Sequence, residues 1–224
     1  MTSQQFPSSS ASFAEALAHA LLEIGAIGFT PDAPVTFKSG IISPVYIDNR
    51  ILPYHPAVWQ QVIAAMQQTI TQDQIEYDVI AGIETGGIPH SAALGFSLQR
   101  PSVFVRKQAK DHGRQQRVEG GMVAGQRVLL IEDQITTGGS SLSGVAALRD
   151  SDATVTDCIA ITSYGMREAV AQFAEAQVRL HVLVNFDAVL KVAGESGKFN
   201  IETIETVREW LGDPRDWTAK YTAR

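Results

Sequence analysis

Two consecutive carboxylates, Glu132 and Asp133, end an apolar run in the middle of the chain. Residues 128–131 before them are all apolar, as in a buried strand. The residues after them are rich in hydroxyl groups and glycine: Gln134, Ile135, Thr136, Thr137, Gly138, Gly139 and Ser140. Glycines let backbone N–H groups approach an anion closely, and a helix start presents the positive end of its dipole. The stretch therefore predicts a phosphate-binding turn at the start of a helix.

Carboxylates beside a phosphate site require a ligand that also carries hydroxyl groups or a cation. The vicinal hydroxyls of a sugar can donate to both acids, and a hydrated Mg²⁺ can lie between an acid and pyrophosphate. A ribose phosphate meets both requirements. The alternative is an ordinary strand end with capping residues, but capping calls for a single Ser or Asp. The nucleotide-binding patterns Gly-x-x-x-x-Gly-Lys-Ser/Thr and Gly-x-Gly-x-x-Gly do not occur in the sequence.

A second candidate for chemistry is the basic segment at residues 106–117, which has five cationic side chains, one acidic side chain and a net charge of +4. Charge concentrated in this way attracts anions. Lys107 and Lys110 could neutralise a departing pyrophosphate, and His112 could donate a hydrogen bond or a proton to it. The segment has no apolar periodicity, which favours a closing loop. An ordinary solvated basic loop is the alternative.

These residues follow strands in the pattern of an α/β protein. Short apolar β-branched runs predict strands at residues 78–83, 102–106, 127–131, 155–161 and 180–184. Helix-forming stretches lie between them at residues 88–98, 140–149 and 167–175. This alternation predicts a parallel sheet covered on both faces, with ligands at the carboxyl ends of its strands.

The amino-terminal part has a different pattern. Ser12 and Glu15 form a capping box, and helical spacing continues to Gly25. The stretch 37–50 predicts a short hairpin or strand pair ending near Ile47, and Pro56 opens a helix that reaches about Thr71. We expect a disordered segment at 1–11, one domain at 12–212 and a tail of unknown role at 213–224.

Composition limits the function classes. The chain has 224 residues, 45% hydrophobic composition and a net charge of −6, which argues against a nucleic-acid partner. The single Cys158 excludes an internal disulfide framework and a multi-cysteine zinc site. No apolar run approaches the roughly 18 residues of a membrane span, and residues 1–10 lack the features of a secretory signal. We expect a cytoplasmic protein without a membrane partner.

Residues 128–140 resemble the phosphoribosyl pyrophosphate (PRPP) signature of the type I phosphoribosyltransferases. The pattern Arg-Lys-x-x-Lys-x-His-Gly at 106–113, followed by Glu119-Gly120, is similar to the catalytic loop of the orotate phosphoribosyltransferases. The resemblance covers about residues 12–200. It implies the type I fold, in which a central parallel sheet is flanked by helices and carries a small amino-terminal hood and a flexible catalytic loop. It also implies a homodimer in which the loop of one subunit closes over the site of the other.

The resemblance further implies roles for individual residues. Lys107, Lys110, His112 and Asp133 would be catalytic, and Arg106 and the whole stretch 132–140 would contribute to PRPP binding. The Lys-Ser-Gly-x-x-Ser-Pro stretch at 38–44 looks like the family hood, so Lys38 would approach PRPP. The residues that would contact orotate are Tyr46, Ile47, Thr136 and Arg167.

Two departures from the family pattern accompany these roles. Many members have an aromatic residue and a Lys at the positions of Thr85 and Gly86, so the backbone of this loop would bind pyrophosphate here. The family often has Asp-Arg after the fourth core strand, whereas Arg167 lies about two places later.

By this resemblance the reaction transfers the 5-phosphoribosyl group from PRPP to orotate in pyrimidine biosynthesis, giving orotidine 5′-phosphate and pyrophosphate. Mg²⁺ would be bound mainly through PRPP, without a dedicated protein cage. Two alternatives are a phosphoribosyltransferase for another base, such as a purine, and a PRPP-sensing transcriptional regulator of the same fold. The spacing of Lys107, Lys110 and His112 favours orotate. A regulator would add a DNA-binding helix pair or a basic face, and neither is evident in residues 1–35 or 190–224.

Overall fold

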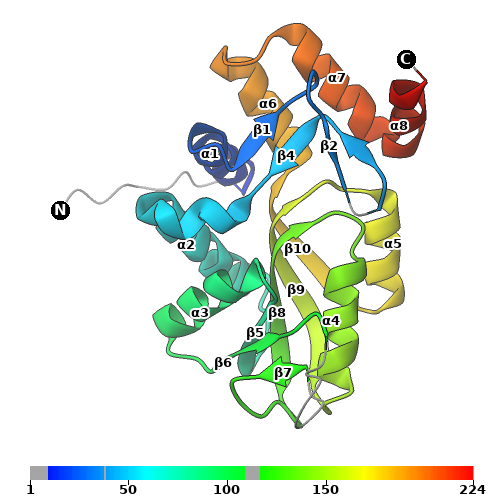
Figure 1. Ribbon diagram of the computed structural model, residues 1–224. Coiled ribbons are helices and arrows are strands. Elements are labelled where there is room, and N and C mark those ends of the chain that lie inside the picture. The colour runs from blue at the N-terminus through cyan, green and yellow to red at the C-terminus, as the bar shows by residue number, and fades with distance from the viewer. Residues whose placement is uncertain (1–9, 38, 109–116, 224) are drawn as a thin grey trace, which may run out of the picture. The chain divides into compact units, whose positions relative to one another are not determined.

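The computed structural model describes residues 10–37, 39–108 and 117–223 (Figure 1). These residues form two compact units. The first unit combines the described residues up to Val58 with those from Val184 onward, and the second covers those from Trp59 to Leu183. Both predicted carboxylates and the described part of the basic segment belong to the second unit.

Six strands form the sheet of the second unit (Figure 1): β5 (Val79–Ile83), β6 (Ser102–Val105), β7 (Val118–Glu119), β8 (Arg127–Ile135), β9 (Thr154–Ser163) and β10 (Arg179–Asn185). Their order is β10-β9-β8-β5-β6-β7. β5 pairs in parallel with both β6 and β8, and β8 pairs in parallel with β9. The short β7 lies antiparallel to β6 at the edge. The five predicted strands are therefore confirmed, and β7 was too short to give a pattern.

β8 is longer than the apolar run that predicted it. Its pairing with β9 continues past Ile131 to the pair Ile135 and Ser163. Backbone pairing with β9 therefore keeps the polar residues from Glu132 to Gln134 in the sheet, and β8 ends at the buried, apolar Ile135. Glu132 and Asp133 lie in this extension, so a regular strand positions both carboxylates.

Helices cover both faces of this sheet, as predicted. They are α3 (Gly87–Leu98), α4 (Gly139–Arg149) and α5 (Arg167–Glu175). A Cβ added to Gly82 of β5 would collide with Ser91 of α3, whereas Ile83 packs where a Cβ on Gly144 of α4 would lie. Neighbouring strand residues point to opposite faces, so α3 and α4 lie on opposite sides of the sheet.

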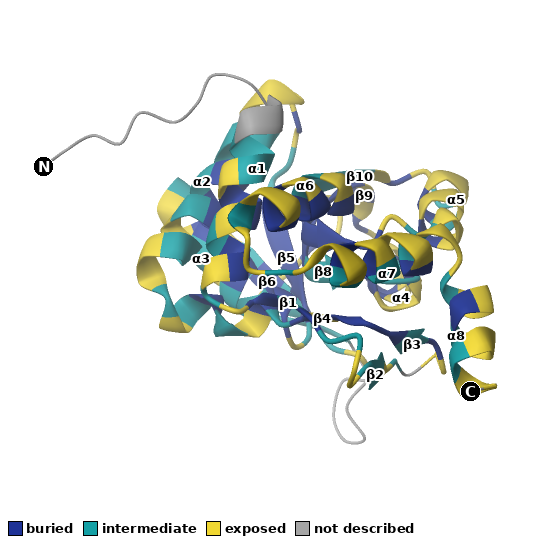
Figure 2. Ribbon diagram, turned by 90° about the horizontal axis from the view of Figure 1, so that it is seen from above, coloured by how far each residue is buried: buried dark blue, intermediate teal, exposed yellow. Residues whose placement is uncertain are grey.

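The core of the second unit fills the α4 side of the sheet. Four strands contribute apolar side chains there: Val79, Ala81, Ile83, Val103, Val105, Val128, Leu130 and Val155. They pack against Val145 and Leu148 of α4 and Phe173 of α5. In Figure 2 the helices carry buried residues on one side and exposed residues on the other. The amphipathic helices thus bury one apolar stripe each against the sheet.

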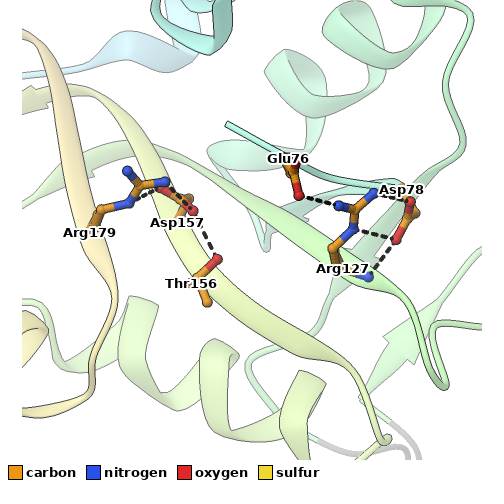
Figure 3. A network of polar contacts seen from close by, with 6 residues as sticks. All are labelled: Glu76, Asp78, Arg127, Thr156, Asp157 and Arg179. Carbon is orange, nitrogen blue, oxygen red and sulfur yellow. Dashed lines mark hydrogen bonds and ion pairs between the residues drawn. The ribbon is translucent and has the colours of Figure 1, made fainter. Parts of the chain in front are cut away.

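Ion pairs and hydrogen bonds between charged residues lie at the amino end of the same sheet (Figure 3). Arg127 at the start of β8 forms ion pairs with Asp78 at 2.8 Å and with Glu76 at 2.6 Å. Nearby, the buried Asp157 accepts hydrogen bonds from Thr156 and Arg179 at 2.9 Å and 3.1 Å. The amino end is therefore a set of paired charges.

The first unit contains helices and two small sheets. Its helices are α1 (Ser10–Glu23), the 3-10 helix η1 (Asn49–Tyr54), α6 (Phe186–Ser196), α7 (Ile201–Gly212) and α8 (Pro214–Thr222). Its strands are β1 (Ile27–Phe29), β2 (Val35–Thr36), β3 (Ile42–Ser43) and β4 (Val45–Ile47). The helix α2 (Pro56–Gln72) begins in this unit and continues into the second. Across the described ranges no helix combines the length and apolar character of a membrane span.

Three expectations about this unit can be compared with the structure. The helix predicted from Pro56 is confirmed, but α1 begins at Ser10 and so contains the expected capping residue Ser12. Residues 37–50 contain two strands that end at Ile47, as predicted, but β3 pairs with β2 and β4 pairs with β1, so the two strands do not form the predicted hairpin. Pro44 separates β3 from β4, and its carbonyl accepts a hydrogen bond from the backbone of Thr30.

The segment after Asp213, for which the sequence indicated no role, forms α8. Asp213 caps the helix by accepting hydrogen bonds from the backbone amides of Arg215 and Asp216. The hydroxyl of Thr218 accepts a hydrogen bond from the backbone amide of Ile42 at 3.0 Å. The tail is thus attached to β3 of the first unit.

Candidate active site

The connection between β8 and α4 has the predicted sequence of strand, glycine turn and helix start. β8 ends at Ile135, and Gly138 precedes α4 with φ of 86°, in the left-handed region that favours glycine. Gly139 and Ser140 are exposed, and no described side chain caps the first amides of α4. The amides at this helix start can therefore face an anion.

The two carboxylates of β8 point to opposite faces of the sheet. Glu132 lies on the α4 side with 5% of its surface exposed, and its Oε1 accepts a hydrogen bond from the Ser141 hydroxyl at 2.9 Å. Asp133 is half-buried, and a Cβ added to Gly86 would collide with its carboxylate. The Asp133 carboxylate therefore lies against the backbone of the β5–α3 loop and is the more accessible of the two.

Glu132 is held in an unfavourable environment for a charge. Its pKa is raised to about 8, first because burial disfavours the charged form and second because the charge of Asp133 is close. The hydrogen bond from Ser141 and the positive charge of Lys107 act in the opposite direction. The charge of Lys107 therefore favours the ionised form of Glu132, although less than burial disfavours it.

The β5–α3 connection forms the second loop at this end of the sheet. The peptide bond between Glu84 and Thr85 is cis, Thr85 is exposed, and Gly86 and Gly87 are buried. A Cβ on Gly87 would collide with the backbone carbonyl of Ile131 in β8. Glycine at this position therefore lets α3 begin directly against β8.

The basic segment leaves the sheet from the same end. Arg106 and Lys107 follow β6, and the backbone amide of Lys107 donates a hydrogen bond to Glu84 Oε2 at 2.9 Å. Arg106 Nη1 forms an ion pair with Glu119 Oε1 at 3.1 Å. The predicted residues Lys110 and His112 lie outside the described residues.

The second unit thus brings together the described parts of three predicted loops. Thr85 and Gly86 lie beside Asp133, Lys107 is attached to the first of these loops, and the stretch from Thr136 to Ser140 leads into α4. Exposed amides at a helix start, the backbone of Lys107 and two carboxylates lie at the carboxyl ends of parallel strands, which is where ligands bind in open α/β sheets.

A family defined by the phosphoribosyl transferase domain matches residues 50–184, more than half of the chain. An orotate phosphoribosyltransferase of Listeria monocytogenes serotype 4b is 40% identical over 201 residues, covering 90% of this chain and 96% of that protein. This chain belongs to the orotate phosphoribosyltransferase family. The family relationship agrees with the resemblance of residues 106–113 and 128–140, and it favours orotate over the two alternative functions.

Solved structures of the family have the same fold. The crystal structure of orotate phosphoribosyltransferase from Aeropyrum pernix matches with a TM-score of 0.71 and 30% identity, covering 80% of this chain and 98% of that chain. The Mycobacterium tuberculosis orotate phosphoribosyltransferase in complex with PRPP matches with a TM-score of 0.60 and 27% identity, covering 80% and 98%. The predicted type I phosphoribosyltransferase fold is therefore confirmed.

The residues that the family resemblance assigns to orotate are distributed over both units. Tyr46 is 40% exposed on β4 of the first unit, where its hydroxyl donates to Asp48 Oδ2 at 3.1 Å, and the neighbouring Ile47 is buried. Lys38, assigned to PRPP, lies outside the described residues. In the second unit Thr136 is half-buried, and Arg167 is the exposed first residue of α5. Their contacts with substrate stay predictions.

Three residues near the family site were not assigned a role from the sequence. Ser141 binds Glu132 and directly follows the predicted hydroxyl run, so that run could have indicated it. Glu84 was recognised only as part of a glycine loop, and Arg117 only as one charge of the basic segment. Their contacts join residues 23 and 26 positions apart, and nothing in the local sequence indicated them.

Proposed function

We propose that this member of the family transfers the 5-phosphoribosyl group from PRPP to orotate and releases pyrophosphate. The observation that carries the proposal is the position of Asp133, beside the backbone of Gly86 and three residues before the turn into α4. This end of the sheet offers carboxylate oxygens that can accept hydrogen bonds from sugar hydroxyls, and backbone amides that can donate to phosphate. Those are the groups that PRPP presents.

Each loop then has a distinct task. Glu132 and Asp133 bind the ribose hydroxyls, with Asp133 as the more accessible acid. The stretch from Thr136 to Ser140 binds the 5′-phosphate, while the backbone at Thr85 and Gly86 binds pyrophosphate. Arg106, Lys107, Lys110 and His112 stabilise the leaving group. The displacement needs no covalent nucleophile, because positioning and charge stabilisation suffice for a transition state with a cationic ribose.

The residues of the site fit Mg²⁺ that arrives with PRPP. Mg²⁺ prefers oxygen ligands, retains several waters and binds through one or two carboxylates together with substrate phosphates. Asp133 presents a half-buried carboxylate of this kind. In the described ranges no group of three His, Cys, Asp or Glu side chains could hold a metal ion. Bound Mg²⁺ would offset the charge of the pyrophosphate.

The acceptor base is proposed to be orotate. The family resemblance assigns contacts with orotate to Thr136, Arg167, Tyr46 and Ile47, and a contact with PRPP to Lys38. The test is to incubate the protein with Mg²⁺, PRPP and orotate and to follow loss of orotate absorbance and release of pyrophosphate. Parallel reactions contain uracil, adenine or hypoxanthine. Consumption of orotate alone supports the proposal, and consumption of a purine instead contradicts it.

Lys107 provides a test of the leaving-group role. Its side chain is exposed and lies outside the buried core, so Lys107→Ala should fold normally. We expect kcat to fall by about 10- to 100-fold with a smaller change in KM for PRPP, because the charge acts mainly on the transition state. An unchanged kcat in steady-state kinetics would remove this role.

We further propose a cytoplasmic homodimer in which Lys110 and His112 of each basic segment serve the site of the partner subunit, while Lys107 serves the site of its own chain. Mixing Lys110→Ala and Asp133→Asn proteins, each of reduced activity, should then give more activity than the two give separately, because hybrid dimers contain one site with both intact residues. Sedimentation would establish the dimer, and mass spectrometry would establish subunit exchange. Confirmed exchange without recovered activity would contradict shared sites.

A further inference from the structure

The two described ends of the basic segment are joined by hydrogen bonds from Arg117, a residue to which the sequence assigned no role. Arg117 Nε donates to the backbone carbonyl of Arg106 at 2.8 Å, and the Arg106 amide donates to the Arg117 carbonyl at the same distance. Arg117 Nη1 also donates to the backbone carbonyl and hydroxyl of Ser143, at 2.9 and 3.0 Å. One guanidinium therefore joins the residue before Lys107 to α4, the helix whose start is the proposed phosphate site.

The other side of Lys107 is fastened by Glu84. Its Oε2 accepts the hydrogen bond from the Lys107 amide at 2.9 Å, and Glu84 lies in the β5–α3 loop, where pyrophosphate is proposed to bind. A carboxylate in such a loop repels an anionic ligand, so a structural role is needed to explain its presence. Charge-assisted hydrogen bonds are stronger than neutral ones, so the Glu84 carboxylate is well suited to hold a backbone amide.

We propose that Glu84 and Arg117 are positioning residues. Together they form a clamp that holds the backbone of Lys107 between the β5–α3 loop and α4, so that its ammonium group meets the leaving group. The catalytic part of this inference rests on the proposed function. The contacts themselves belong to one compact unit.

The physical reason for such a clamp is the freedom of a lysine side chain. Lys107 is exposed, and a flexible four-carbon side chain loses conformational entropy each time it takes one geometry. Fixing its backbone on both sides leaves only the side chain to be ordered by substrate. Because a displacement of about 1 Å in a catalytic group can lower a rate by about 100-fold, the clamp should affect turnover more than binding.

The first test measures the clamp without any substrate. Hydrogen exchange by NMR at the Lys107 amide is compared in wild type, Glu84→Ala and Glu84→Gln. Glu84→Ala should raise the exchange rate by about tenfold, the effect of losing one hydrogen bond of ordinary strength, whereas Glu84→Gln keeps an acceptor oxygen and should restore much of the protection. Glu175→Ala, at an exposed position of α5, is the matched control.

The second test asks whether the clamp acts through Lys107. Glu84→Ala and Arg117→Ala should each lower kcat by about tenfold and leave KM for orotate nearly unchanged. Arg117→Lys should recover little, because an ammonium cannot reproduce the donors to Arg106 and Ser143 together. In a Lys107→Ala background, Glu84→Ala should cause little further loss of kcat, since interacting residues are not additive.

The outcomes separate this inference from the proposed function. Unchanged exchange at Lys107 in Glu84→Ala overturns the clamp. Faster exchange with unchanged kcat, or full additivity with Lys107→Ala, overturns its catalytic role. If wild-type protein transfers no phosphoribosyl group to orotate, the proposed function fails, and the exchange measurement still decides whether Glu84 holds the Lys107 backbone.

Discussion

The two ends of β8 place charged residues in opposite electrostatic situations. At the amino end Arg127 is matched by Asp78 and Glu76, and the pKa of Asp78 is lowered to about 2, first by the hydrogen bonds from Arg127. At the carboxyl end the pKa of Glu132 is raised to about 8, because burial and Asp133 both disfavour its charge. One strand thus begins at carboxylates whose charge is stabilised by Arg127 and ends at a carboxylate, Glu132, whose charge is disfavoured.

A second strand shows the same matching at its amino end. Burial alone would raise the pKa of Asp157, but hydrogen bonds from His181, Arg179 and Thr156 outweigh it and hold that pKa below its usual range. The amino end of the sheet therefore contributes stability. The carboxyl end keeps an electrostatic cost that hydroxyl donors or a cation can relieve, as expected where ligands bind.

The largest expected effect concerns the pH dependence of stability. Between the ordinary pKa of 4.5 and the raised value of about 8, the folded protein keeps the Glu132 proton while the unfolded chain loses it. The free energy of unfolding should therefore fall as pH rises through this window, by an amount on the order of 4 kcal/mol from this group. Glu132→Gln should be more stable than wild type at pH about 8 and show a flatter profile. Urea denaturation at both ends of the window measures this, and parallel profiles would contradict it.

A smaller effect is expected on kcat/KM when the accessible carboxylate, Asp133, is changed. Asp133→Asn should lower kcat/KM for PRPP by about 10- to 150-fold, because hydrogen bonds to a charged group contribute about 1.5–3 kcal/mol. The control is Asp78→Asn at the amino end of the sheet, which should keep its activity. Equal losses of kcat/KM in both variants, measured by steady-state kinetics, would show that the two ends of the sheet do not differ in their role in the reaction.

The close approach of α3 to β8 gives the third prediction. Gly87→Ala places a Cβ against the Ile131 carbonyl, so backbone must shift, and the free energy of unfolding should fall by about 1–3 kcal/mol. Gly212→Ala, which meets nothing within 4 Å, serves as control. Thermal denaturation of both variants is the measurement, and equal midpoints would argue against the tight packing.

The smallest effect is expected from the exposed ion pairs at the amino end. Arg127→Gln should lower the midpoint of thermal unfolding modestly at low ionic strength and less at high ionic strength, because salt screens exposed charges. Since the pKa of Asp78 is lowered, its contribution is present above its ordinary value of 3.8 and is lost as pH falls toward about 2. A loss independent of salt would indicate packing rather than charge.

Much of the fold could be predicted from periodicity. Continuous apolar runs such as residues 128–131 predict buried strands, and the helix at residues 167–175 was predicted with the observed bounds. Strand pairing was less predictable, because it depends on partners distant in the sequence. The expected hairpin within residues 37–50 failed for this reason, since β1 and β2 supply the partners of β4 and β3.

The sequence by itself determined the chemistry that this end of the sheet contains. The order of acids, hydroxyls and glycines from Glu132 to Ser140 indicates a sugar phosphate, because each residue type has a local physical use. Only the tertiary structure decided how those groups are presented. The burial of Glu132, the contact of Asp133 with Gly86 and the attachment of Lys107 to Glu84 depend on which strands and loops meet. Solvent exposure and the distances between remote residues are established only when the chain packs. The pKa of Glu132 and the position of Lys107 depend on them, so local sequence could not specify either.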